Sequence, residues 1–435
     1  MQLRYVSNGL VSFTLLAGMY SFGTFGLFNL FGVRLLVQIV VIGLMANIFV
    51  MLPPQYKSQD RFSVVLFFTL FALCSLFYNG QYSSVIEAII MLFITHIIFS
   101  ASKQQILSFS KALVYVTSIL CILVITAYAY YKISPDQVSQ ANINIYDSTV
   151  GTAQVYPSHF MDWISFTSGE GFEFQGNSSL RMKGYSNEPS STIVHYLAPA
   201  VLAFFLGGRF AFLGVFILIV NMIAIASFIG HIIFTLSLMF FIIYIGIKYY
   251  SNYIKYVIPI VVVFFIVLIS KLELLITVFE YVGGKAIDLI GFDLISRKVS
   301  GDSLVGRQSG VTDCLSLLLL SPFGYPIEKI GAGAGLLYSV SARTGWLGVG
   351  VFVLFIIKLI SKLPKLLLAL RSNGVKYSIS LLSSVLLVTL FVSGYGWERP
   401  PGLIMLLLFF RIVQQTVEGG HTTATPDSVG VYHFR

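Results

Sequence analysis

The chain has 435 residues, of which 57% are hydrophobic and only 10% are charged. A soluble domain carries about 25% charged residues, so the composition excludes an ordinary soluble protein and predicts one that crosses a membrane many times. The net charge is +9, but the basic residues gather between apolar segments, which is a topology signal and gives no reason to expect nucleic-acid binding.

Apolar segments recur from one end of the chain to the other. A helix that spans a bilayer needs roughly 20 apolar residues, and about 17 are tolerated. We therefore expect an all-α polytopic membrane protein with about twelve transmembrane helices. The segments are 9–30, 32–52, 62–79, 84–101, 112–131, 191–208, 210–229, 231–247, 256–273, 344–361, 378–394 and 401–416.

Two long stretches do not fit this pattern and are expected to be large loops. The resulting order is transmembrane helices 1–5 (1–131), a first large loop (132–190), helices 6–9 (191–273), a second large loop (274–343), helices 10–12 (344–418) and a polar tail (419–435). The tail, GGHTTATPDSVGVYHFR, is rich in Gly and Thr, and we expect it to be disordered.

Lys and Arg are distributed unequally between the short connections. Cytoplasmic connections carry an excess of these residues. With the N-terminus in the cytoplasm, NGQYSS (79–84) and SFIGH (227–231) lie outside and contain none. Both termini are thus expected in the cytoplasm, with both large loops outside, which is the periplasm if the organism is Gram-negative. The cytoplasmic connections hold Lys57, Arg61, Lys103, Lys111, Arg209, Lys248, Lys255, Lys358, Lys362, Lys365, Arg371 and Lys376.

Several kinds of chemistry lack their sequence motifs. There is no HExxH, Walker A or GxSxG motif, and no DxD pair in a suitable context. Cys74, Cys121 and Cys314 are far apart, which argues against a zinc site. We therefore expect no metal ion and no cofactor. The predicted spans contain few ionisable residues, chiefly Glu87 and His96, and this disfavours an ion-coupled transporter.

The first loop ends in RMKGYSNEPSSTIVHY (181–196), directly before an apolar segment. Pro followed by hydroxyl residues is a helix-start signal. Arg181 and Lys183 are explained either as ordinary solvated loop residues or as donors to an anion at the membrane surface. Glu188 has two explanations as well. It is either a carboxylate that is favourable at a helix N-terminus or a functional residue of the same motif as Arg181.

The second loop places Arg307 before the run VTDCLSLLLLSPFGYP (311–326), which is too short to span a bilayer and predicts a surface-lying or re-entrant helix. Arg343 and Arg399 are expected at the same external level. Each alone is explained as an interfacial anchor. The four external arginines, Arg181, Arg307, Arg343 and Arg399, together predict at least one anion site, because the Arg guanidinium donates paired hydrogen bonds to phosphate and stays charged.

The stretch RMKGYSNEPSSTIVHYL resembles the Arg-x-x-Gly…Glu-Pro-Ser pattern at the end of the large periplasmic loop in Wzy-type O-antigen polymerases. GRQSG…SPFGYP…GAGAGLLYSVSARTGWLGV is similar to the second-loop pattern of the O-antigen ligase/polymerase superfamily. The matching elements are Arg307, Pro322 to Gly324, and Gly345 to Gly348. The resemblance covers the topology of most of the chain, but specific residues only in these two stretches.

The resemblance implies a GT-C-like, metal-independent glycosyltransferase at the periplasmic face of the bacterial inner membrane. It would move a growing glycan from undecaprenyl pyrophosphate to the non-reducing end of a lipid-linked repeat unit. Membrane lipid and a Wzz-type chain-length co-polymerase are the implied partners. Ligases of the superfamily carry a His in the second loop, and this chain has none between Glu280 and Arg343. The missing His favours a polymerase over a ligase. The two long external loops favour a polymerase over a flippase, whose loops are evenly short.

The expected roles follow from a pyrophosphate leaving group. Arg181 and Arg307, which the resemblance carries over, would stabilise its developing charge. Lys183, Arg343 and Arg399 are added by their position as substrate-binding residues. Glu188 is the first candidate for the general base, with orientation of Arg181 as an equal alternative. The second candidate is His195, which is also expected to lie near substrate.

Overall fold

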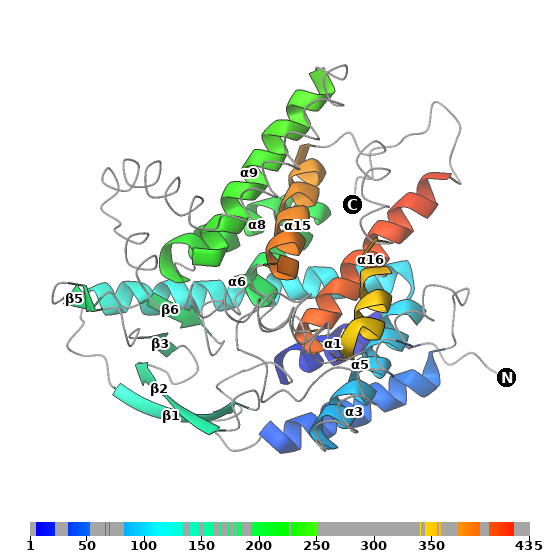
Figure 1. The fold of residues 1–435 in the computed structure, drawn as a ribbon, viewed down its shortest axis with the longest axis horizontal. Helices are drawn as coiled ribbons and strands as arrows, with labels where there is room; N and C mark the ends of the chain where they lie inside the picture. The colour runs from blue at the N-terminus through cyan, green and yellow to red at the C-terminus, as the bar shows by residue number, and fades with distance from the viewer. Residues whose placement is uncertain are drawn as a thin grey trace.

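A computed structural model (Figure 1) describes residues 6–21, 34–52, 66, 69, 82–133, 140–147, 152–159, 165–167, 173–174, 177–178, 181–184, 193–225, 228–249, 340, 344–354, 356–357, 373–391 and 400–421. Most of these residues are helical, as the sequence predicts. The α-helices are α1 (Asn8–Ser21), α3 (Arg34–Met51), α5 (Tyr82–Ser100), α6 (Lys103–Ile133), α7 (Ala198–Leu206), α8 (Arg209–Val220), α9 (Phe228–Tyr249), α15 (Asn373–Phe391) and α16 (Pro400–His421).

The predicted apolar segments coincide with these helices wherever the chain is described. Within the described residues, Lys103–Tyr130 is the one helix long and apolar enough to cross a membrane by length and composition, and further apolar helices of 10–17 residues accompany it. The predicted segments 256–273 and most of 62–79 lie outside the described residues. Twelve crossings, and the orientation derived from Lys and Arg, stay predictions.

Two groups of helices pack against α6. One group contains α1, α3 and α5, and the other contains α7, α8, α9 and α15, while α16 crosses α6 and contacts α1, α5 and η3 (Figure 1). The long helix α6 packs on α1 in the first group and on α7 and α8 in the second. Gly18 lets α1 approach α3 closely, because a Cβ atom at this position would collide with the end of the Met45 side chain.

The part of α16 from residue 401 to 411 is buried on every side. Phe410 makes an edge-to-face contact with Phe99 of α5 at a centroid distance of 5.9 Å. A helix that is apolar all round belongs in the interior of a helical protein. Arg411 lies in this helix and has 0% exposure.

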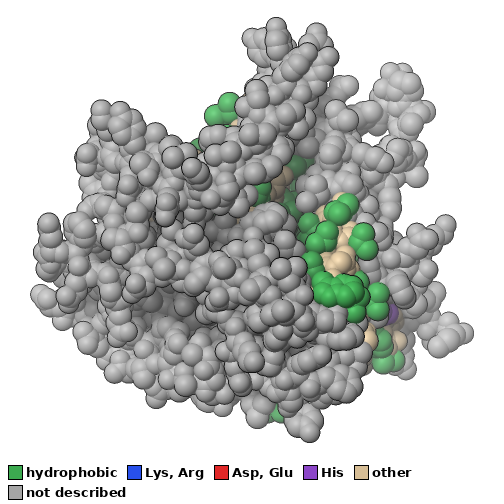
Figure 2. All heavy atoms as spheres, in the orientation of Figure 1, with side chains coloured by type: hydrophobic (Ala, Val, Ile, Leu, Met, Phe, Trp, Pro, Cys, Tyr) green, Lys and Arg blue, Asp and Glu red, His purple; other side chains and the backbone are tan. Residues whose placement is uncertain are grey.

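The outer helices, in contrast, expose large apolar side chains. Phe13 is 60% exposed, Val50 83% and Phe212 79%. Figure 2 shows apolar side chains at the surface of one face. Trp346 and Leu354 are also exposed, by 54% and 58%. Large apolar surfaces are rare on monomeric soluble proteins, so this distribution agrees with helices that face lipid.

A capping box begins α6 and ties it to the start of α1. The Ser102 amide donates to Gln105 Oε1 at 2.8 Å, and the Gln105 amide donates to Ser102 Oγ at 3.2 Å. This reciprocal arrangement satisfies two donors at the helix start. Gln105 Nε2 also donates to the Val6 carbonyl at 2.9 Å, so one side chain joins two helices.

Replacing Gln105 with Ala is therefore expected to lower the free energy of unfolding by about 1–2 kcal/mol, because a cap is lost and the Val6 carbonyl loses its donor. Thermal unfolding of the purified protein in detergent measures the change. The exposed neighbour Gln104 provides the control, and its replacement by Ala should change stability by less than about 0.5 kcal/mol. Equal effects of the two substitutions would contradict the dual role of Gln105.

Helices α7 and α8 form a hairpin. Gly207 and Gly208, with φ of 67° and 53°, join them in a conformation that residues with a Cβ atom rarely adopt. The two helices approach closely, since a Cβ atom at Gly214 would lie 3.1 Å from the Ala203 Cβ and 3.2 Å from the Phe204 ring. The N-terminal end of α7 and the C-terminal end of α8 therefore lie at the same end of the hairpin.

The first loop contains β-strands, which the all-α prediction did not include. Antiparallel pairs form between β1 (Gln140–Asp147) and β2 (Thr152–His159), between β3 (Ser165–Thr167) and β6 (Arg181–Gly184), and between β4 (Glu173–Phe174) and β5 (Asn177–Ser178). The strand sequence QANINIYD alternates apolar and polar residues at its centre, a pattern typical of a strand. Figure 1 shows the strands near the C-terminal end of α6, and β6 contacts α6.

Candidate functional site: two π-turns beneath a loop strand

Two π-helical turns mark the open end of the α7–α8 hairpin. The first, η3 (Ile193–Leu197), leads into α7, and the second, η4 (Asn221–Ile225), ends α8. Such turns are rare and occur frequently at functional sites. Strand β6 lies against η4, while η3 packs against α8, α9 and α16. We call η3, η4 and β6 together the π-turn end.

The register of the hairpin places the two π-turns at the same level along its arms. Gly214 of α8 lies opposite Ala203 and Phe204 of α7. Seven residues are about two helical turns, and in an antiparallel pair that step leads from Gly214 to Asn221 and from Phe204 to Leu197. Asn221 is thus at the level of η3, which contains His195 and Tyr196 and contacts α8.

The π-turn end contains buried polar side chains. His195 is 5% exposed, and Tyr196 and Asn221 are 0% exposed. Neither Oδ1 nor Nδ2 of Asn221 makes a hydrogen bond. A buried polar group without a hydrogen bond costs about 1–3 kcal/mol, so Asn221 destabilises the structure in which it is found.

The structure brings part of the predicted site to this end. Arg181 and Lys183 belong to β6, and Arg181 is paired with Thr167 of β3 in the strand register. Because β6 lies against η4, the strand with both basic residues is at the end of the hairpin that also contains His195. His195 itself is enclosed between helices and has little access to the surface.

Four other predicted residues lie outside the described part of the chain: Glu188, Arg307, Arg343 and Arg399. Their assignment to the site stays a prediction. Arg399 directly precedes Pro400 in the sequence, the first residue of α16, and α16 contacts η3.

The sequence reasoning missed two buried polar residues, Asn221 and Arg411. Both interrupt apolar runs, in FILIVNMIAI and LLLFFRIVQQ. Arg411 was recognisable, because a charge inside an apolar segment is a signal for a functional or pairing role. Asn221 was not found because only ionisable residues were considered. His96, which was considered, lies 3.0 Å through Nε2 from the Leu52 carbonyl and stacks against Phe49, so it joins α5 to α3.

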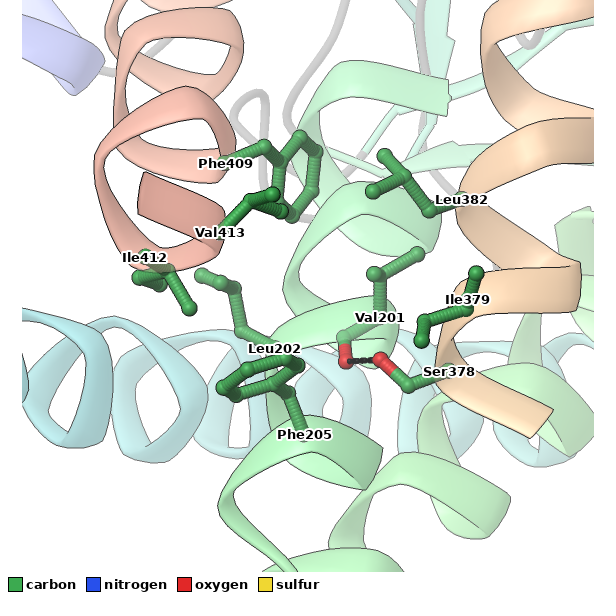
Figure 3. Close-up of a pocket in the computed structure, with 9 residues that line it drawn as sticks. All are labelled: Val201, Leu202, Phe205, Ser378, Ile379, Leu382, Phe409, Ile412 and Val413. Carbon is green, nitrogen blue, oxygen red and sulfur yellow. Dashed lines mark hydrogen bonds between the residues drawn. The ribbon is translucent and has the colours of Figure 1, made fainter. Parts of the chain in front are cut away.

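A second candidate location is an apolar pocket between α7, α15 and α16 (Figure 3). Its walls include Leu202, Phe205, Leu382 and Phe409, and its free volume is about 10 Å³. That is room for one water molecule. Ser378 donates to the Val201 carbonyl at 2.7 Å beside it. The pocket is too small for a sugar or a cofactor, and no group of three His, Cys, Asp or Glu side chains gathers anywhere in the described part of the chain.

Comparisons with known proteins add little to these observations. No family model matches the chain, and no curated protein matches it. A chain of the structure "Structural coordination of polymerization and crosslinking by a peptidoglycan synthase complex" is similar at 13% identity and a TM-score of 0.37, over 83% of this chain and 98% of that chain. Such a TM-score does not establish a common fold, so function is argued from the residues themselves.

Proposed function

We propose that the chain is a membrane glycosyltransferase that polymerises a surface glycan, an O-antigen polymerase of the Wzy type. The observation that carries the proposal is the position of β6. This strand, which contains Arg181 and Lys183, packs against η4. It joins the basic loop motif, which resembles that family, to a part of the helical bundle with buried polar residues.

The proposed reaction needs stabilisation of a leaving anion. A hydroxyl of the acceptor sugar attacks the anomeric carbon of the donor glycan, the bond to pyrophosphate breaks, and a base accepts the hydroxyl proton. Preorganised cations stabilise the charge that develops on the leaving oxygen. We assign this role to Arg181 and Arg307, with Lys183, Arg343 and Arg399 as further contacts to the substrate. Arg181 and Lys183 belong to one short strand, two residues apart, which suits two donors to one anion.

The base is either Glu188 or His195. Glu188 belongs to the same motif as Arg181 and serves either as the base or as the group that orients Arg181. His195 lies in η3 at the π-turn end, and its burial requires the acceptor hydroxyl to enter between the helices. The glycan acceptor and donor are both lipid-linked in this proposal, on undecaprenyl pyrophosphate, and a Wzz-type partner would set the polymer length.

The directions of the helices agree with the proposed crossing pattern. Figure 3 shows α7 and α16 running the same way past the pocket, and α15 running the opposite way. Crossings that begin at 191 and 401 are both expected to enter from the periplasmic face, and the crossing that begins at 378 from the cytoplasm. In that arrangement η3 and the start of α16 are both periplasmic, beside the first loop.

Deletion of the gene, followed by gel analysis of lipopolysaccharide, tests the proposed function. A deletion strain should attach one repeat unit to the core, and the wild-type gene should restore the full ladder. Free lipid-linked polymer in the deletion strain would instead indicate a ligase. Absence of repeat units outside the inner membrane would indicate a flippase. Either of these results, or an unchanged ladder, would overturn the polymerase proposal.

A further inference from the structure

Asn221 differs from several buried serines of the helices. Ser110, Ser118 and Ser384 each donate a hydrogen bond to the carbonyl four residues earlier in the same helix. Such local bonds satisfy a hydroxyl inside an apolar bundle. Asn221 has both a donor and an acceptor in its side chain, and neither is used.

The amide is on the inward face of its helix. Phe210, Gly214, Ile217 and Leu218 are buried along α8, and Asn221 continues this face at the next turn. Of these positions, Gly214 lies against α7. Asn221 therefore continues the face of α8 that packs on α7, and its turn, η4, contacts β6, α6 and α9.

We propose that Asn221 is a glycan-binding residue, whose amide donates to and accepts from a hydroxyl group of the acceptor sugar. This inference rests on the proposed polymerase function and names the part of the substrate that the π-turn end recognises. A sugar hydroxyl both donates and accepts, as the amide does. The pyrophosphate is a poorer match for Asn221, since it carries negative charge and Arg181 and Lys183 supply the cations.

The amide has no exposed surface, so the glycan reaches it when β6 and the π-turns separate. A site that is closed when empty and polar inside explains why an unpaired amide persists at a position where a hydrophobic residue would stabilise the bundle. An enclosed amide also discriminates against an acceptor sugar that lacks the hydroxyl group, because the amide would then stay without a hydrogen bond.

Asn221→Leu separates this role from a structural one. Leu has a similar size and needs no hydrogen bond, so the midpoint of thermal unfolding of the purified variant should be unchanged or higher. The ladder of the complemented deletion strain should fall to one repeat unit on the core. The free repeat-unit oligosaccharide, released from lipopolysaccharide by mild acid, should raise the unfolding midpoint of the wild-type protein and leave that of the variant unchanged.

Thr14→Val is the matched control. Thr14 is also 0% exposed, and its hydroxyl makes no hydrogen bond, but it lies on α1, which packs on α3, α6 and α16. This variant should keep the full ladder and the response to the oligosaccharide. If Asn221→Leu fails to accumulate in the membrane, Asn221→Ala takes its place with the same expectations for the ladder and the oligosaccharide response, although the cavity left by Ala lowers the unfolding midpoint. A full ladder, or an unchanged oligosaccharide response, in the folded Asn221 variant would overturn the inference. Failure of the wild-type gene to restore the ladder would overturn the polymerase proposal instead.

Discussion

Replacement of Arg181 with Ala is expected to abolish the lipopolysaccharide ladder and to slow polymerisation by about 10²–10³-fold, the usual loss when one preorganised donor to a developing charge is removed. Arg307→Ala should have an effect of the same order. The measurement is the ladder of a deletion strain that carries each variant, with the amount of protein in the membrane determined in parallel. Full ladders from both variants would show that neither arginine is needed for polymerisation.

Arg181→Lys separates geometry from charge. A guanidinium donates two parallel hydrogen bonds to a phosphate, whereas an ammonium acts as a point charge. We therefore expect Lys to restore only a small part of the activity lost in Arg181→Ala. Arg209→Ala is the matched control, because Arg209 begins α8 beside the Gly207–Gly208 turn, far along the hairpin from the π-turn end. Its guanidinium stacks on the Tyr115 and Phe210 rings at 5.9 Å and 5.4 Å, and its loss should leave the ladder intact.

Arg411→Ala is expected to cause the largest loss of stability, about 3 kcal/mol or more, in line with truncation of large side chains in a core. Arg411 is fully buried in α16, which packs on α1, α5, α6 and η3. Its replacement by Ala leaves a cavity, and the groups that bind the buried guanidinium lose their partner. The loss is measured from thermal unfolding in detergent.

Two comparisons make the Arg411 result decisive. Arg411→Met keeps most of the volume and should retain more stability than Arg411→Ala, since a buried ionic group replaced by a well-packed apolar one is often nearly neutral. Arg209→Ala, at an exposed arginine, should cost about 0.5–1 kcal/mol, the usual value of an exposed cation–π contact. An Arg411→Ala protein as stable as Arg209→Ala would contradict the buried position of Arg411.

The helices were predictable because apolar length alone specifies them. The predicted segment 84–101 corresponds to Tyr82–Ser100, and 378–394 overlaps Asn373–Phe391. The segment 112–131 began too late, because the capping box at Ser102 and Gln105 starts α6 at Lys103, in a polar stretch that a hydropathy criterion ignores. Helix starts depend on individual side chains more than on average composition.

The candidate site was predictable only in part. The motif drew attention to Arg181, but nothing local in the sequence indicates that β6 lies on η4, because this contact joins segments that are separated by α7 and α8. The two π-turns could not be predicted either, because the sequences IVHYL and NMIAI do not differ from those of ordinary α-helix. Packing of the hairpin arms, and not propensity, sets the level at which Asn221 meets η3.

The Gly207–Gly208 turn has a consequence for how the chain can evolve. The turn connects the two arms at the end opposite the π-turns, so the alignment of Asn221 with η3 depends on the number of residues in each arm. One residue added to α8 alone would rotate Asn221 by about 100° around the helix axis and direct it away from η3. Insertions and deletions in α7 and α8 should therefore survive in descendants only as matched changes of length, whereas substitutions on the outer faces of the same helices are free to accumulate.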